Sequence, residues 1–489
     1  MKRPSELYIA ALLGVIATLG RVYFPTEPVG AWVIRIVSGV YALAFLVRAF
    51  TAPPASPRPL RTRVGMGLGL LPLLVLLGLM TGYGFTIAYI FFRWTLAVLL
   101  LGAVIAVGVV AWHVRQGRLR GVVLQVLVVS LVFVSATCFG PLCMWMWAKP
   151  DLATCQQVAG QPGVTRLTPD IYLEQGSFPY DMAYIPSQQR IAGSFKMAGN
   201  LAIGMWDNPE ANRLVVVDVT DQAHPVLGEL HLEGDPLPQY MTIGPTEDEL
   251  LVNRLGYERH LLDYIDLTNF PTLRLSQRVE TVPLPHGMQR ISDDQLLLAT
   301  MRREVMLLDY ASGEVQLSRP IHTFLATPGV TVTDLAVSPD AQTGYLSMFG
   351  THIVAVDLSD GDLAMRSGPV GMGGGLVTHD PLLPRLYRTD FFQNVLHVMD
   401  SQTLEIVRET PLSFTPRPTA VAPKRDLVAI GAWIEGVVHF MKRSDGAPID
   451  VTIPVGPYLR KLAIDDERGL LFAGTKCGIV MVDLETFGL

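Results

Sequence analysis

Hydrophobic and polar positions alternate in short runs through the last two thirds of the chain, and turns punctuate the runs at regular intervals. The stretch NRLVVVDVTDQAHPVLGELHLEG (212–234) has an aliphatic run closed by an aspartate, a turn, and a second run with polar alternation. Short runs of β-branched and aliphatic residues bounded by turn residues are typical of β-strands. The stretch therefore predicts a hairpin. The same pattern of aliphatic run, polar residue and turn occurs six more times.

One polar position closes the aliphatic strand in each of these seven hairpins. Successive positions are 41 to 48 residues apart. An aspartate at a strand end can accept hydrogen bonds from backbone N–H groups about two residues further on. We therefore predict turn-forming residues rather than acids or metal ligands at Asp218, Asp266, Asp309, Asp357, Asp400, Lys442 and Asp483.

Two further strand-like runs precede each hairpin, most clearly in VTDLAVSPDAQTGYLSMFGTHIVAVDLSDGDL (332–363). Four strands in each unit of about 40 to 45 residues predict a β-propeller. Seven units give an all-β seven-bladed propeller over 165–489. The last unit ends after its third strand, and TRLTPDIYLEQG (165–176) is predicted to supply the fourth, so that the ring has no open edge.

Two of the repeats resemble known bacterial propeller families. LVVVDVTDQAHPVLGEL resembles the LVIVD repeat, and LAVSPDAQTGYLSMFGTHIVAVDLSDGDL is similar to a YVTN-type blade. The likeness covers about two thirds of the chain. It implies the propeller fold and leaves the function open, because propellers of these families serve many functions.

The first 149 residues have a different composition and predict a membrane domain. They carry a net charge of +11 and the remaining residues −17. Their apolar runs are long enough to cross a bilayer, so we predict about five transmembrane helices. Basic loops alternating with nearly uncharged ones place the amino terminus in the cytoplasm and the propeller in the periplasm or outside the cell, in a bacterial plasma membrane. The predicted spans lie near 7–24, 30–50, 65–85, 87–112 and 121–147, and 150–164 is the predicted linker.

The acidic propeller excludes nucleic acid as an expected partner, because it has no basic stripe. Four cysteines do not make a disulfide scaffold. Cys143 and Cys155 could pair in an oxidising compartment, or both could be free thiols.

The loops that enter the innermost strands are predicted to converge on one face, around the mouth of a central channel. A ring of carboxylates, guanidinium groups and one imidazole there would suit a small polar or anionic ligand, although a merely hydrated channel mouth would also be polar. Blade five contributes only the glycines of 371–375, interpreted as a flexible connection. The predicted mouth residues are Tyr180, Asp181, Gln239, Tyr240, His286, Thr333, Asp334, Arg417, Arg460 and Lys461.

Two other features are candidate contact sites. The long loop 196–212 carries apolar residues, including Met205 and Trp206, and it predicts either contact with an envelope protein or packing on its own blade. Arg35 and Arg93 fall inside predicted spans, where they could meet an anionic ligand, a quinone or a lipid phosphate, or extend to the outer interface.

No local motif predicts a cofactor or a metal. The histidines share no metal-binding spacing, and the glycines of 371–375 lack a phosphate-binding context. The pattern favours a membrane-anchored binding or scaffold module over an enzyme. The alternative is a membrane enzyme with its site at the channel mouth. The layout is similar to that of membrane-bound quinoprotein dehydrogenases, and the YVTN-like blade is similar to lactonase propellers. The tryptophan docking motif of the first and the metal-binding carboxylates of the second are not found.

Overall fold

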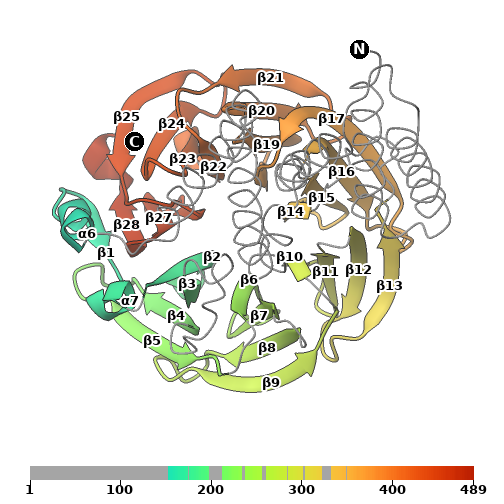
Figure 1. Ribbon diagram of the computed structural model, residues 1–489, viewed down its shortest axis with the longest axis horizontal. Helices are drawn as coiled ribbons and strands as arrows, with labels where there is room; N and C mark the ends of the chain where they lie inside the picture. Colours follow the sequence, from blue (N-terminus) through green and yellow to red (C-terminus); the bar gives the residue numbers. More distant parts are fainter. Residues whose placement is uncertain are drawn as a thin grey trace, which may run out of the picture. The chain divides into compact units, whose positions relative to one another are not determined.

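Seven four-stranded antiparallel sheets surround a common centre in the computed structural model, which confirms the seven-bladed propeller (Figure 1). The structure describes residues 152–489 apart from 175, 198–211, 234–236, 256–259, 283–284, 301–302, 322–331, 349 and 392. The predicted membrane domain lies outside these residues, as does Cys143. Within them, no helix has the length and apolar character needed to span a bilayer.

Each blade consists of four strands that follow one another in the sequence, except in blade seven. From the innermost strand outward, blade one has β2 (Ser177–Ile185), β3 (Arg190–Met197), β4 (Arg213–Asp218) and β5 (Val226–His231). Blade two has β6 (Leu237–Ile243), β7 (Glu249–Leu255), β8 (Leu261–Asp266) and β9 (Arg274–Glu280), and blade three has β10 (Pro285–Arg290), β11 (Gln295–Thr300), β12 (Glu304–Asp309) and β13 (Val315–Pro320). Blade four has β14 (Val332–Val337), β15 (Thr343–Met348), β16 (Gly350–Asp357) and β17 (Met365–Gly373), and blade five has β18 (Val377–His379), β19 (Arg385–Asp390), β20 (Val395–Asp400) and β21 (Ile406–Pro411). Blade six has β22 (Pro416–Ala422), β23 (Leu427–Ala432), β24 (Val437–Lys442) and β25 (Pro448–Pro454), and blade seven has β26 (Lys461–Asp465), β27 (Leu470–Thr475), β28 (Gly478–Asp483) and β1 (Val164–Arg166). The helical segments are α6 (Leu152–Ala159), α7 (Asp170–Glu174), η2 (Pro423–Arg425) and η3 (Leu484–Phe487).

The repeated polar positions end the third strand of every blade, as predicted. The backbone N–H of Thr220 donates to Asp218 Oδ1 at 2.9 Å, and that of Thr268 donates to Asp266 Oδ1 at 2.8 Å. Equivalent bonds form at Asp309, Asp357, Asp400 and Asp483. In blade six, where the position holds Lys442, Asp445 accepts instead from the N–H of Ala447 at 2.8 Å. The interpretation of the aspartates as turn formers is confirmed.

The ring is closed by a strand from the amino-terminal side, as predicted, but that strand is shorter. Only Val164–Arg166 pairs with β28, whereas Asp170–Glu174 of the predicted strand 165–176 forms α7. Pro169 explains the difference, because proline cannot donate to a strand ladder and is readily accommodated at the start of a helix. The closing strand therefore turns away from the sheet after Arg166.

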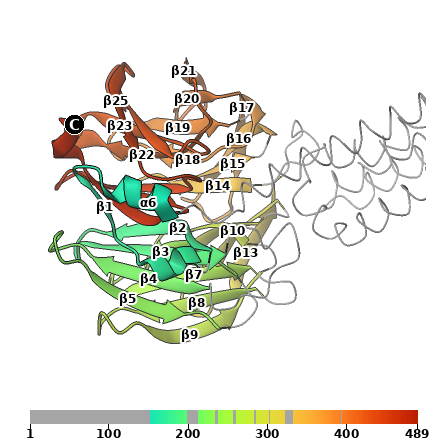
Figure 2. The same ribbon diagram turned by 60° about the vertical axis from the view of Figure 1, so that its left-hand side comes forward.

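The predicted linker 150–164 contains α6, which lies beside β1 (Figure 2). Cys155 of α6 forms a disulfide with Cys477 in the turn between β27 and β28, and both residues are fully buried. The pairing of Cys155 with Cys143 is therefore wrong. The two bonded cysteines are 322 residues apart in the sequence, and the disulfide links the start of the closing segment to the last blade.

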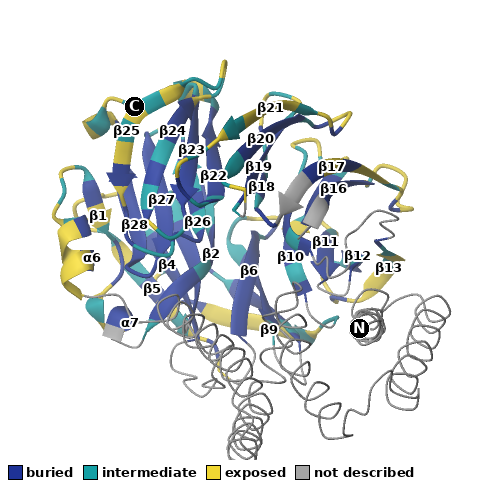
Figure 3. Ribbon diagram, turned by 45° about the horizontal axis from the view of Figure 1, so that its top comes forward, coloured by how far each residue is buried: buried dark blue, intermediate teal, exposed yellow. Residues whose placement is uncertain are grey.

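The core lies between neighbouring blades, because both faces of each sheet are covered. In β11, Leu297 and Ala299 pack toward blade four, whereas Leu296 and Leu298 pack toward blade two. Such two-sided burial explains why the central strands are continuous apolar runs. The outermost strands are mostly exposed, and Figure 3 shows the change from buried inner strands to exposed outer ones.

We predict that the disulfide contributes strongly to stability. Cys477→Ser should lower the free energy of unfolding by about 3–5 kcal/mol, because the bond closes a very long loop in the unfolded chain. Denaturant unfolding of the full-length protein, followed by circular dichroism, measures the change. A reducing agent should lower the midpoint of the wild-type protein and leave that of the C155S/C477S double variant unchanged. Equal midpoints for wild type and C477S would contradict the prediction.

Candidate functional site

Backbone bulges at the start of the innermost strands place the predicted site residues. The strand register shifts near the beginning of β2, β6, β10, β14 and β22. In four of these strands the shift begins at a proline, at Pro179, Pro238, Pro285 and Pro416, which is where a residue without an N–H is tolerated in a sheet. A bulge re-aims the side chains that follow it. The residues directly after these prolines are Tyr180, Gln239, His286 and Arg417, all predicted mouth residues.

Three rings from consecutive blades contact one another at this end of the channel. The ring centres of Tyr180 and Tyr240 are 5.6 Å apart, and those of Tyr240 and His286 are 5.1 Å apart, both in edge-to-face geometry. The Tyr240 hydroxyl lies 3.3 Å from His286 Nδ1 and also donates to the carbonyl of Thr333 at 3.4 Å. Burial and nearby anionic groups raise the pKa of Tyr240, so it stays a neutral donor.

Cations lie over these and neighbouring rings. Lys196 Nζ is 3.4 Å and the Arg460 guanidinium carbon 4.1 Å from the centre of the Tyr180 ring. The Arg417 guanidinium lies 4.5 Å from the centre of Trp433, which in turn contacts Tyr458. We call Lys196, Arg417 and Arg460, with the rings of Tyr180, Tyr240, Trp433 and Tyr458, the mouth cluster.

The three cations of the mouth cluster have no carboxylate partner among the described residues. Arg417 Nε and Arg460 Nε are buried and donate no hydrogen bond there. Burial, and then repulsion from Arg460, lowers the pKa of Arg417 to about 10, which leaves it charged at neutral pH. The cluster therefore has positive charge that the described protein does not compensate.

Lys196 differs from the two arginines because it can lose its charge. Its side chain is only 4 % exposed. Burial first, and then repulsion from Arg460, holds its pKa well below the usual range. A desolvated cation–π contact returns about 2 kcal/mol, whereas burying an unpaired ammonium costs several kcal/mol. The surroundings of Lys196 therefore favour the neutral amine more than those of an exposed lysine do.

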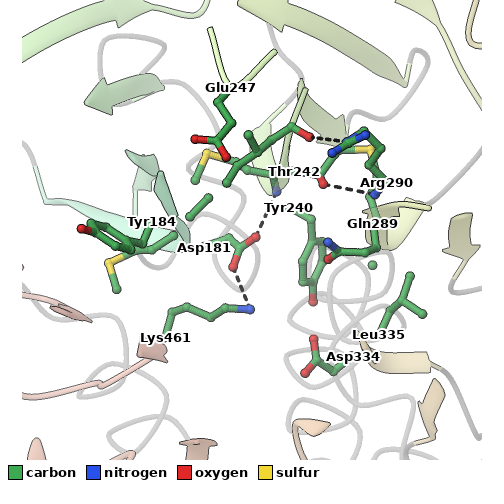
Figure 4. A pocket seen from close by; sticks show the side chains of 16 residues that line it. Asp181, Tyr184, Tyr240, Thr242, Glu247, Gln289, Arg290, Asp334, Leu335 and Lys461 are labelled. Carbon is green, nitrogen blue, oxygen red and sulfur yellow. Dashed lines mark hydrogen bonds and ion pairs between the residues drawn. The ribbon is translucent and has the colours of Figure 1, made fainter. Parts of the chain in front are cut away.

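A polar belt crosses the channel next to the mouth cluster. Lys461 Nζ of blade seven lies 3.1 Å from Asp181 Oδ1 of blade one, and Figure 4 shows Asp334 and Tyr240 across from this pair. Burial lowers the pKa of Lys461, but the Asp181 and Asp334 carboxylates outweigh it and raise the pKa overall. Burial raises the pKa of Asp334 against the opposing effect of Lys461. The belt therefore has a compensated cation, unlike the mouth cluster.

Both carboxylates of the belt also join neighbouring blades. Asp181 Oδ2 accepts from the backbone N–H of Met241, and Asp334 Oδ2 from that of Val377, each at 3.0 Å. Two cavities of about 350 and 330 Å³ are lined by the innermost strands, and Asp334 and Lys461 line both. The predicted ring of ligand residues thus divides into a structural belt and the mouth cluster.

Glycine in blade five fits close packing rather than a flexible connection. The Gly375 carbonyl accepts from Thr333 Oγ1 at 2.7 Å and from Ser347 Oγ at 2.9 Å. A Cβ added at Gly375 would lie 1.4 Å from the carbonyl oxygen of Thr389. The absence of a side chain at Gly375 therefore lets the chain lie against β19 of blade five while its carbonyl accepts from β14 and β15 of blade four. Of the predicted connection 371–375, residues up to Gly373 belong to β17.

The remaining predicted residues have different outcomes. Gln239 is 2 % exposed, and its Oε1 accepts no hydrogen bond within the described residues. Met205 and Trp206 of the predicted partner loop, and Arg35 and Arg93, lie outside those residues. No group of three or more potential metal-binding side chains occurs in the described part of the chain.

Sequence reasoning missed Lys196, Tyr458 and the role of Trp433. Lys196 ends the second strand of blade one, on the face already predicted to hold the mouth, so its position was a usable signal. Trp433 follows β23, again at the end of a second strand. Tyr458 lies two residues before Arg460, on the chain entering the next innermost strand.

The comparisons with known proteins support the fold. No protein-family model and no curated protein matches the chain. Among solved structures, the β-propeller domain of Cps50 (Swd1) from Myceliophteria thermophila matches with a TM-score of 0.50 and 11 % identity, over 63 % of this chain and 97 % of that one. Identity this low shows the propeller fold alone. The likeness to LVIVD and YVTN repeats remains a resemblance.

We predict that His286 makes the propeller sensitive to acid. Burial, and then the charges of Arg460, Lys196 and Arg417, lower its pKa to about 3, against about 6.5 in an unfolded chain. Between these values the unfolded state binds more protons, so stability falls as the pH falls from about 6.5 toward 3. His286→Gln cannot take up this proton. Between pH 7 and pH 5, its free energy of unfolding should therefore fall by about 1–2 kcal/mol less than that of the wild-type protein.

Denaturant unfolding at the two pH values tests this prediction. His224→Gln is the matched control, because the His224 side chain is 84 % exposed. Other histidines whose pKa burial lowers, including His352 and His379, are the same in both variants. Identical pH dependence in H286Q and wild type would show that His286 does not contribute.

Proposed function

We propose that the protein is a membrane-anchored binding module whose propeller mouth takes an anionic ligand. The observation that carries this proposal is the pair Arg417 and Arg460, which are stacked on aromatic rings and have no carboxylate partner among the described residues. The Nε–H of each guanidinium donates no hydrogen bond within the described residues. A carboxylate or phosphate group would accept hydrogen bonds from such guanidinium groups in a charge-assisted, bidentate manner.

Two arginines elsewhere in the propeller support this interpretation, because each is paired with a carboxylate. Arg254 is fully buried, and its Nη1 lies 3.1 Å from Asp263 while Nη2 donates to two backbone carbonyls. Arg443 makes a bidentate pair with Asp380 at 2.7 and 2.6 Å. Breaking a buried pair by removing one partner is strongly destabilising. The two mouth arginines depart from this pattern at the site where the chain enters the innermost strands, which favours an external anion as their partner.

Membrane anchoring and compartment rest on other observations. The five apolar runs before residue 149 have the length of transmembrane helices. The buried disulfide between Cys155 and Cys477 suits an oxidising compartment, since cytoplasmic reductants keep most thiols reduced. Both features agree with a propeller on the outer side of a bacterial plasma membrane. An envelope protein contacting Met205 and Trp206 remains a prediction.

We predict that the two arginines together determine anion affinity. Hydrogen bonds to charged groups contribute about 1.5–3 kcal/mol each, so R417Q/R460Q should bind at least about 100-fold more weakly. Inorganic phosphate and pyruvate are suitable probes, and isothermal titration calorimetry of the full-length protein measures their affinity. Arg274→Gln is the control, because Arg274 is exposed on an outermost strand. Equal affinities for the double variant and wild type would exclude the mouth as the anion site.

A further inference from the structure

Lys196 has surroundings unlike those of the other lysines that the structure describes near the channel. Its side chain makes no ion pair and no hydrogen bond with the described residues, and its Nζ faces the Tyr180 ring at 3.4 Å. Lys461, by contrast, is held by Asp181. Lys476 lies over a different ring, that of Tyr458, at 5.2 Å. Lys196 is thus a buried amine that shares the Tyr180 ring with Arg460, one of the two proposed anion-binding arginines.

A neutral amine next to an anion site has a specific chemical use. An amine is a nucleophile only when it is unprotonated, and desolvation beside another cation is an established way to keep a lysine in that form. The same two factors, burial and Arg460, act on Lys196. Lys196 Nζ and the Arg460 guanidinium both lie against the ring of Tyr180, so an anionic ligand on Arg460 would lie in the same cluster as Nζ.

We propose that Lys196 captures a small carbonyl compound as a reversible imine, while Arg460 and Arg417 bind a carboxylate or phosphate group of the same molecule. The ligand class is therefore a carbonyl compound with an adjacent anionic group, such as a 2-oxo acid. This inference rests on the proposed anion site and adds a covalent step to it.

The reaction balances without an oxidant or reductant. The Nζ lone pair attacks the carbonyl carbon, a C–N bond forms, and the carbonyl oxygen takes up a proton. The hydroxyl group formed in this way then leaves as water together with the remaining proton of the amine. The C=N bond of the imine forms as the C–O bond breaks. Hydrolysis reverses both steps, so the site would hold its ligand covalently and release it unchanged.

Reductive trapping tests the proposal. The full-length protein is incubated with pyruvate and sodium cyanoborohydride at neutral pH, and peptide mass spectrometry locates the reduced imine. We expect Lys196 to be the first lysine modified, at pyruvate concentrations at least about 10-fold lower than those that label exposed lysines such as Lys424. Acetone, which has the carbonyl but no anionic group, should label Lys196 far less.

Variants separate charge from nucleophilicity. Lys196→Arg places a permanent cation at this position and cannot form an imine, so the first label should disappear. R417Q/R460Q should raise the pyruvate concentration needed to label Lys196 by at least about 10-fold. Lys424→Arg is the matched control, because Lys424 is 60 % exposed and paired with Glu467, away from the mouth, and it should leave labelling of Lys196 unchanged.

The outcomes distinguish this inference from the proposed function. If phosphate binds the wild-type protein at the mouth but pyruvate labels only exposed lysines, the imine is wrong and the anion site stands. If neither phosphate binding nor labelling of Lys196 occurs, both proposals are wrong. Labelling of Lys196 that acetone achieves as well as pyruvate would overturn the assigned ligand class.

Discussion

The propeller depends on closure of its ring, because an open seventh blade would leave both a sheet edge and an unmatched blade face in water. Closure takes place at two radii. At the outer radius β1 pairs with β28, and the backbone of Asp483 donates to Gly163 at 2.8 Å. At the inner radius, Lys461 of blade seven contacts Asp181 of blade one. Because blades one and seven are joined at the channel, the innermost strands are held at fixed positions. The side chains of the mouth cluster near these strands are therefore held in place as well.

Closure also accounts for where the site lies. The innermost strands need their backbone groups paired with neighbouring blades, and side chains such as Asp181 and Asp334 meet this need at the level where bulges begin. The bulges, four of which begin at a proline, re-aim the residues that follow them. Carboxylates are thus used within the belt, and the cations beyond the belt lack such partners. A structural requirement therefore produces the charge asymmetry of the channel.

The sequence was sufficient for features encoded by local pattern. The aspartates that end the third strands, the four strands of each blade and the count of seven all follow from residues close together in the chain. Features that depend on distant pairs were missed or misassigned. Cys155 pairs with Cys477 rather than with nearby Cys143. Arg460 reaches the Tyr180 ring, which Lys196 also contacts, only because the first and last blades are neighbours in the ring. The sequence repeat predicts that the ring exists. It does not indicate which charged side chains of the first and last blades pair with each other.

The mouth cluster is destabilising because its positive charge has no carboxylate partner among the described residues. This unpaired charge is confined to one place in the fold. Buried arginines in other blades are matched by carboxylates and carbonyls, and the belt cation Lys461 is matched as well. Burial, and then repulsion from Arg460, lowers the pKa of Arg417. An anion that binds both would remove the repulsion and satisfy their donors at once, so binding and folding stability are coupled through the same two residues. A ring closed by backbone pairing and by the contact between Lys461 and Asp181 can tolerate this local cluster of positive charge at its centre.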